Sequence, residues 1–416
     1  MMKLRPACCA ALAVLLTVGL CSCGRREAEP PPPKTVLRII HYESEGQQAW
    51  INVFNSFMEE NPDIAIDYDL TGGDEYMKLL RARFLSNEPM DIVGVHPGGE
   101  EALLYARSGY LHDITGEPFL EGIRPDALES GMWENRHYGV PLHRCYIVCL
   151  YNQDIFEKYG LTPPGTWSEF LSICRRLASE GETPIAQGIK EPFVTQLIAI
   201  ALAVTAVYRD DPHANDKLLS GEAGFSTPEW KKVMEMYQSL APYFSEGFED
   251  ITYHQCLSDF ASQKAAMTVM GTFSLQLLKL ENPHLRYGAF VLPASEDGDN
   301  WTPFSVGGMM AINEQSEHKE EALRFFTYLM RDDVYYRFLS ECLNLPVRER
   351  IPVDYDPVLE QLASTTGNTF IFMNREWPLE LSEAFRRGIQ EMFAGLEIDD
   401  VLRKLDDVAA RLAEIP

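Results

Sequence analysis

Two hydrophobic periods alternate along the N-terminal third of the chain. Residues 36–41 form a nearly continuous apolar run, and residues 64–70 alternate apolar with polar positions, so both segments predict β-strands. Residues 50–58 carry apolar side chains at helical spacing, and a helix there would end at Asn61 and Pro62. A second helical pattern and a short third strand follow, at residues 76–84 and 91–95. This alternation of apolar strands and helices predicts right-handed crossovers and a parallel sheet.

The remainder of the chain predicts a helix-rich α/β region. Thr166, with Glu169 three positions later, matches a capping box and opens a helix through Leu177. Residues 190–285 predict mostly helix. The other expected elements are strands at 140–151, 287–292 and 308–313, and helices at 319–331 and 333–343. An amphipathic helix closes the chain and carries on one side Val401, Leu405, Val408 and Leu412.

The first 22 residues carry the pattern of a secretory signal peptide. Lys3 and Arg5 precede a charge-free apolar run over residues 7–20, which is shorter than the roughly twenty residues that cross a bilayer. The run ends at Leu20-Cys21-Ser22-Cys23, which resembles the bacterial lipobox, with Cys23 as the residue to be lipidated. An ordinary secretory signal cut at another position is the alternative. Residues 23–35 are polar and proline-rich, so we expect an extended lipidated tether.

The charge balance restricts the partners of the chain. The sequence has 36 basic and 62 acidic side chains, a net charge of −26, and removal of residues 1–22 takes away two basic side chains and makes it −28. Such a surface argues against nucleic acid as a partner and against long-range attraction of an anionic ligand. Roughly 380 residues of ordinary hydrophobic content follow the tether, enough for two or three domain-sized cores.

Five cysteines lie beyond the signal segment, at positions 145, 149, 174, 256 and 342. Their odd number means that they cannot all pair within one chain, and none has the CxxC spacing typical of zinc sites. We expect mostly buried cysteines that pack as small apolar side chains, with one disulfide as the alternative. The cysteines therefore give no support for a metal site.

No motif for catalysis or nucleotide binding stands out. The sequence contains neither HExxH nor GxSxG, and its abundant carboxylates single out no glycosidase pair. His41, Tyr42 and Glu43 follow the first predicted strand, and His96 follows the third. Because ligands of open parallel sheets bind beyond the carboxyl ends of the strands, these side chains predict a pocket for a neutral ligand. Ordinary strand-end residues are the alternative.

Several motifs occur in an order and spacing that resemble one protein family. The clearest are YGVP at 138–141, YNQDIFEKYGL at 151–161 and PGTWSEF at 164–170. FASQKAAMTVMG at 260–271 and Gly307-Gly308 before the helix at 320–329 extend the match over nearly the whole mature chain. These segments resemble the extracellular solute-binding proteins of family 1, the carbohydrate-type, maltose-binding-protein-like receptors of ABC importers.

The resemblance implies an α/β fold of the periplasmic-binding-protein-like type II class, with two α/β domains, a hinge and a ligand cleft. The expected N-terminal lobe comprises residues 36–142 and 272–325, and the helix-rich C-terminal lobe comprises residues 143–271 and 326–416. The implied protein is a monomeric receptor, held by its lipid at the cell surface or in the periplasm. It captures a sugar or oligosaccharide by closing and delivers it to the ABC permease, without catalysis, cofactor or metal. A family member that binds a polyamine or a phosphorylated compound, and a surface-anchored glycan hydrolase, are the alternatives.

Matching to the cleft positions of the family implies ten ligand contacts, namely Tyr42, Glu43, Gly73, Asp74, His96, Arg144, Phe273, Trp301, Arg375 and Trp377. Aromatic faces would stack on the apolar face of a sugar, and polar groups would hydrogen-bond its hydroxyls. Four of them have a rival role: Tyr42 packing on the sheet, Asp74 capping a helix, Arg144 pairing with an acid and Trp301 covering a loop.

Two aromatic candidates have distinct expectations. Phe273 stands where the family often has a tryptophan nearby, so we expect a different aromatic contact there. Trp377 lies in the segment NREWP and is the main stacking platform expected in the C-terminal half.

Overall fold

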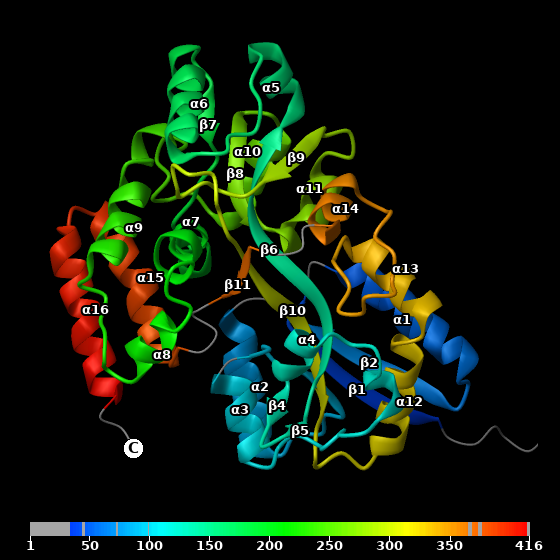
Figure 1. Ribbon diagram of the computed structural model, residues 1–416. Coiled ribbons are helices and arrows are strands. Elements are labelled where there is room, and N and C mark those ends of the chain that lie inside the picture. Colours follow the sequence, from blue (N-terminus) through cyan, green and yellow to red (C-terminus); the bar gives the residue numbers. More distant parts are fainter. Residues whose placement is uncertain are drawn as a thin grey trace, which may run out of the picture. The chain divides into compact units, whose positions relative to one another are not determined.

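The structure is a computed structural model that describes residues 34–43, 46–71, 74–98, 100–364, 368–372 and 377–413, apart from the side chains of residues 74, 75, 100 and 101. The predicted lipidation site Cys23 and the expected tether up to residue 33 lie outside these residues, whereas Thr35, the last residue expected in the tether, begins the first strand. The part from residue 34 onward forms one compact unit. Its described strands form one nine-stranded sheet and a separate two-stranded ribbon (Figure 1).

The N-terminal region has the parallel βαβαβ arrangement that the sequence predicts. Its elements are β1 (Thr35–His41), α1 (Gln47–Glu60), β2 (Ile64–Leu70), α2 (Asp74–Ser86), β3 (Ile92–Gly94) and α3 (Glu100–Arg107). β1 pairs in parallel with both β2 and β3. Leu37 and Ile39 pack in one hydrophobic cluster with α1, and Ile40 packs in another with α2 and α3. Helices therefore cover both faces of this part of the sheet, as expected for apolar parallel strands.

Short elements lead from this region into two long strands. They are η1 (Pro118–Leu120), α4 (Pro125–Glu129), β4 (Met132–Trp133) and β5 (Arg136–His137). The long strands β6 (Val140–Asn152) and β10 (Thr302–Ile312) run antiparallel beside each other (Figure 1). β10 pairs with β3 at one end, whereas β6 pairs with β8 at the other, in the order β2-β1-β3-β10-β6-β8-β7. These two strands therefore join the N-terminal part of the sheet to the rest.

The second region is richer in helix. Its elements are α5 (Gln153–Tyr159), α6 (Trp167–Ser179), β7 (Thr183–Ile185), α7 (Pro192–Ala203), the π-helix η2 (Val204–Tyr208), α8 (Ala214–Leu219), α9 (Pro228–Gln238), η3 (Ala241–Tyr243), α10 (Tyr253–Ala261), β8 (Ala265–Gly271), η4 (Thr272–Ser274), α11 (Leu275–Glu281) and β9 (Tyr287–Phe290). After β10 come α12 (Lys319–Leu329), α13 (Asp332–Cys342), α14 (Pro357–Ser364), β11 (Thr369–Ile371), α15 (Leu379–Phe393) and α16 (Ile398–Ala413). Val401 and Leu405 are buried in α16, on the side that the sequence predicts.

Hydrophobic packing divides the chain at different places from the expected lobe boundaries. Residues 275–294 were expected in the N-terminal lobe, but Leu275, Leu278 and Ala289 pack in the large cluster of the second region. The reason is that β9 pairs with β6, so the chain crosses back only along β10. Helix α12 begins at Lys319 and helix α13 at Asp332. Both pack instead with α1 and β1. The N-terminal cluster thus reaches Ile351 rather than residue 325.

The structure adds detail to two further predictions. Residues 190–285 are mostly helical as predicted, but they also include the strand β8, whose seven residues are all buried between β6 and β7. A short, wholly apolar run has no periodicity that separates a buried strand from a helix. β10 begins at Thr302 rather than Gly308, because its first residues pair with β11 and β6 despite the interruptions by Pro303 and Gly307.

Other predictions from the sequence are confirmed. Thr166 and Glu169 form the reciprocal hydrogen bonds of a capping box at the start of α6. The five cysteines beyond the signal segment are all buried thiols, so they pack as small apolar side chains. Among the described residues, no helix is both long enough and apolar enough to cross a bilayer.

Candidate functional site

Polar and aromatic side chains gather where β1 and β3 end beside the crossing strands. His41 is the last residue of β1, Tyr42 and Glu43 follow it, and His96 comes shortly after β3. β1 pairs with β3, β3 pairs with β10, and β10 pairs with β6, so the ends of β1 and β3 lie beside the inner part of the two long strands. The structure thus brings together Tyr42, Glu43 and His96, as the topology rule for parallel sheets predicts.

Tyr42 is the middle ring of a three-ring stack. Its ring lies 4.6 Å from that of His41 and 4.1 Å from that of His96, with interplanar angles of 17° and 14°. If His41 and His96 stacked at these distances on the same face of Tyr42, their rings would overlap each other. The two histidine rings therefore cover opposite faces of Tyr42. The hydroxyl of Tyr42 also donates to the carbonyl oxygen of Gly307, at 3.0 Å. Tyr42 therefore packs within the site, and the half-buried His96 is the outer ring of the stack.

Glu43 forms a close pair with His143 of β6. Nε2 of His143 lies 2.5 Å from Oε1 of Glu43, and only 2% of the His143 side chain is exposed, against 15% for Glu43. Burial alone would raise the pKa of Glu43, but the charge and the hydrogen bond of His143 bring it below its ordinary value. Glu43 is therefore held as a carboxylate that is still in contact with solvent.

His41 lies next to the pair of Glu43 and His143, and its imidazole is neutral. Its Nδ1 accepts a hydrogen bond from the backbone N–H of Glu43 at 3.0 Å, which orients the residue that follows Tyr42. Burial lowers the pKa of His41 to about 4, because the charged imidazolium would lose its hydration. The N–H bond to Nδ1 also requires that this nitrogen carries no proton.

A bulge in β10 makes room for the Glu43–His143 pair. The pairing of β10 with β6 shifts register on both sides of Gly308. A Cβ atom at Gly307 would overlap the His143 imidazole, and one at Gly308 would overlap the Glu43 carboxylate. The two glycines, which belong to the family resemblance in the sequence, are therefore a steric requirement of the site.

Arg144 follows His143 on β6 and has an acidic partner. Its guanidinium lies over the rings of Phe304 and Tyr146, at 4.9 and 5.4 Å from their centroids. Nη2 also lies 3.5 Å from a carboxylate oxygen of Asp126. The rival role expected for Arg144, an ion pair with an acid, is therefore present in the structure.

The remaining aromatic candidates belong to the second region. Phe273 and Trp301 are half-buried and pack against its large hydrophobic cluster. Trp301 donates its backbone N–H to Oγ1 of Thr205 at 2.8 Å, whereas its buried indole Nε1 has no hydrogen-bond partner among the described residues. The structure does not bring these two side chains into contact with Tyr42, Glu43 or His96.

Trp377 is a core residue in this structure, which corrects its expected role as a stacking platform. Only 2% of its surface is exposed, and its indole N–H donates to Oδ1 of Asn215 at 2.6 Å. Its ring packs against Phe225 and Phe385. A ring enclosed in this way has no face to offer a ligand. The physical reason is that α15 and the residues before α9 close over it.

Three candidates cannot be placed in the site. Gly73 and Arg375 lie outside the described residues, and Asp74 is the first residue of α2 with its side chain outside the described part. Sequence reasoning missed His143. The one signal for it was a polar residue within the apolar run at 140–151, whereas its partner is 100 positions away.

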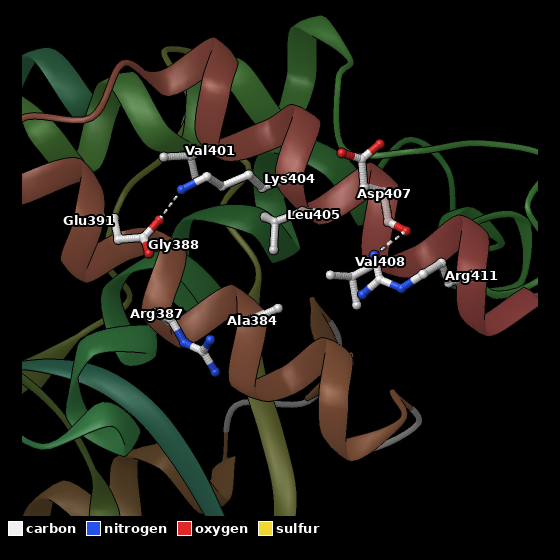
Figure 2. Close-up of a pocket in the computed structure, with 10 residues that line it drawn as sticks. All are labelled: Ala384, Arg387, Gly388, Glu391, Val401, Lys404, Leu405, Asp407, Val408 and Arg411. Atoms are coloured by element: carbon white, nitrogen blue, oxygen red, sulfur yellow. Dashed lines mark hydrogen bonds and ion pairs between the residues drawn. The ribbon is translucent and has the colours of Figure 1, made fainter.

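A shallow depression lies elsewhere, between α15 and α16. Figure 2 shows its lining, which includes Gly388, Val401 and Leu405, and its volume is about 320 Å³. Lys404 and Glu391 form an exposed ion pair across it at 2.7 Å. The depression shares no residue with the site at the ends of β1 and β3. Among the described residues, no cluster of three or more His, Cys, Asp or Glu side chains has an arrangement that could hold a metal ion.

The chain is similar to known binding proteins over most of its length. A family model described as bacterial extracellular solute-binding protein matches residues 42–335. The multiple sugar-binding protein of Streptococcus mutans is 23% identical over 374 residues, which are 88% of each chain. The melibiose/raffinose/stachyose-binding protein MelE of Bacillus subtilis is 23% identical over 352 residues, 80% of this chain and 78% of that protein.

Solved structures of binding proteins share the fold. The solute-binding protein RafE in complex with raffinose superposes with a TM-score of 0.80 at 19% identity, covering 91% of this chain and all of that one (100%). A chitin oligosaccharide binding protein gives a TM-score of 0.78 at 18% identity, covering 91% and 99%. These likenesses confirm the predicted fold class, an α/β fold of two domains as in periplasmic binding proteins of type II.

Proposed function

We propose, from the premise that this chain belongs to the family of bacterial extracellular solute-binding proteins, that it captures a neutral sugar or oligosaccharide for an ABC permease. Members of this family are binding proteins of transporters and not enzymes, so the chain binds its ligand without converting it. The observation that carries the proposal is the cluster of His96, Tyr42 and Glu43 beside the two crossing strands.

The chemistry of this cluster suits a sugar. A carboxylate accepts hydrogen bonds from hydroxyl groups, and such charge-assisted bonds are stronger than neutral ones. The half-buried ring of His96, backed by Tyr42, provides a flat surface for the C–H face of a pyranose. The names of the relatives agree with this assignment, since one binds multiple sugars and another melibiose, raffinose and stachyose.

The two crossing strands provide a physical basis for closure around the ligand. β6 and β10 contribute residues to both hydrophobic regions, and the bulge at Gly307 and Gly308 interrupts their pairing. A closing motion about such strands would bring Phe273 or Trp301 toward the cluster at the ends of β1 and β3. In the proposed bound state, these half-buried rings would form the second wall of the site.

The anchor belongs to the same proposal. Lipidation at Cys23 would hold the receptor at the cell surface or in the periplasm, and the proline-rich segment would let it reach the permease. The receptor would act as a monomer, because one chain carries both regions.

A titration of the purified chain from residue 24 onward tests the proposal. We would measure heats of binding to raffinose, stachyose, chitin and xylan oligosaccharides, with spermidine and an inositol phosphate in parallel. Saturable binding of a neutral glycan, recovered unchanged after prolonged incubation, is the expected result. Binding of spermidine alone would instead identify an amine receptor, an outcome that the net charge of −28 makes worth testing.

A further inference from the structure

In the pair between Glu43 and His143, only one of the two carboxylate oxygens is bonded to the imidazole. Oε1 of Glu43 contacts His143 Nε2, and no donor among the described residues hydrogen-bonds to Oε2. His143 is almost wholly buried, whereas Glu43 retains 15% of its side-chain exposure. The carboxylate therefore keeps some contact with solvent, and one of its oxygens has no hydrogen-bond donor among the described residues.

We propose that His143 is a positioning residue, which holds Oε1 of Glu43 and balances its charge so that Oε2 accepts hydrogen bonds from the hydroxyls of a neutral ligand. This inference rests on the proposed function, since it assigns a role within the same site. His143 itself touches Glu43 and the glycine bulge rather than the ligand.

Charge balance explains why such a residue matters for ligand choice. A lone, largely buried carboxylate is costly and would attract any cationic group of the right size. A His143 side chain that donates its Nε2–H to the carboxylate offsets part of this negative charge, so an ammonium ligand gains less, while the second oxygen still accepts hydroxyl protons. His143 would therefore favour polyhydroxylated ligands over polyamines at this position.

The other titratable side chains around Glu43 form no hydrogen bond with its carboxylate in the described part of the structure. His41 is neutral above a pH of about 4, because its pKa is lowered by burial, and its Nδ1 accepts the N–H of Glu43. The thiol of Cys342 on α13 is also neutral, because burial raises its pKa far above its ordinary value. Glu341 on the same helix accepts a hydrogen bond from Asn52. Among the described residues, His143 is the side chain that hydrogen-bonds to the carboxylate, whereas the ring of His96 stacks on Tyr42 and its charge acts on Glu43 through space.

The chain contains a natural control for the experiment. His112 and Glu314 form a pair of the same chemistry, with Nδ1 of His112 at 2.6 Å from Oε2 of Glu314, on the exposed surface. The hydrogen bonds of His112 in the described part of the chain go to Glu314 and, through its backbone, to Ile312, and not to Tyr42, Glu43 or His96. Substitution of His112 by Gln therefore changes a His–Glu pair without altering the proposed site.

The experiment compares the wild-type chain with His143→Gln, His143→Ala, Glu43→Gln and the control His112→Gln. Glutamine can keep a donor near Oε1 but has no charge, so it separates geometry from charge. Binding of raffinose, or of the glycan that the wild type binds most tightly, is titrated alongside spermidine. We expect His143→Gln and His143→Ala to weaken glycan binding by about tenfold or more, and to shift the preference toward spermidine.

The preference between glycan and spermidine provides a readout that a purely structural role would not change. General damage to the site would weaken both ligands, whereas loss of the His143 contact should weaken the glycan and favour spermidine, and His112→Gln should change neither. Glycan binding by His143→Gln and His143→Ala with unchanged affinity and unchanged preference would overturn the inference. If the His143 variants do not fold, the nitrogen-15 shifts of the wild-type imidazole decide, because a His143 without a proton on Nε2 cannot donate to Glu43 and contradicts the inference. A wild type that binds no glycan would instead refute the proposed function.

Discussion

Gly307 of β10 lies against the imidazole of His143 on the neighbouring strand β6, so closely that a Cβ atom would overlap the ring. The carbonyl oxygen of Gly307 also accepts the hydroxyl hydrogen of Tyr42. The glycine thus links both parts of the candidate site, the ring stack and the charged pair. Because it has no side chain, the two crossing strands can approach with a buried histidine between them.

Replacement of Gly307 by alanine should therefore destabilise the protein. The added methyl group must displace His143, and overpacking of this kind costs about 1–3 kcal/mol in the free energy of unfolding. Urea unfolding of Gly307→Ala and of the wild type measures this difference in the free energy of unfolding. Gly165→Ala is the matched control, because a Cβ there would meet Glu169 at an ordinary 3.6 Å. Equal stability of both variants would mean that β10 shifts to accommodate the methyl group.

Acidification should weaken the fold through His41. Its pKa is about 4 in the folded protein and 6.5 ordinarily, so the unfolded chain binds the proton more readily between these values. The associated stability is complete above pH 6.5 and is lost as the pH falls to 4, a change of about 3 kcal/mol. The lowered pKa of Glu43 acts in the same direction at the acid end. Thermal unfolding between pH 7 and 4 should show a smaller slope for His41→Phe than for the wild type.

Trp377 should govern stability rather than affinity. Truncation of a buried tryptophan costs about 3–5 kcal/mol, so Trp377→Ala should unfold at a much lower urea concentration. Trp377→Phe should lose less, since it keeps most of the packing against Phe225 but not the hydrogen bond to Asn215. Folded Trp377→Phe should bind glycan as the wild type does. A selective loss of affinity in this variant would restore the stacking role that the sequence predicts.

His96 should contribute to affinity with little effect on folding. It is half-buried, so His96→Ala leaves the core intact while removing the outer ring of the stack. We expect glycan affinity to fall about fivefold to tenfold, the equivalent of about 1 kcal/mol for an aromatic contact. Calorimetry measures the affinity, and the unfolding midpoint is the control. Unchanged binding would place the ligand away from this ring.

Cys23 should control location and not ligand binding. Cys23→Ala should be released from the membrane fraction, because no acyl chain can be attached, while its glycan affinity stays the same. Fractionation followed by titration of the soluble protein checks both. Retention of Cys23→Ala in the membrane would support an uncleaved or differently processed N-terminus.

The sequence alone determined much of the architecture. The periods of apolar residues located β1, α1, β2 and α2, because an amphipathic pattern has to match the geometry of the element that buries it. The same rule, with the carboxyl ends of parallel strands, identified Tyr42, Glu43 and His96 as neighbours. The order of the motifs indicated the family, which the comparisons then established.

Only the tertiary structure decided how these side chains act. It paired Glu43 with His143 across 100 positions, enclosed both faces of Tyr42 and buried Trp377 among other rings. It also showed β8 as a strand, since neighbours in the sheet and not periodicity determine the form of a short apolar run. Local pattern records which residues need burial. The partner that satisfies a buried charge, or the neighbour that covers a ring, depends on contacts between segments that are distant in sequence.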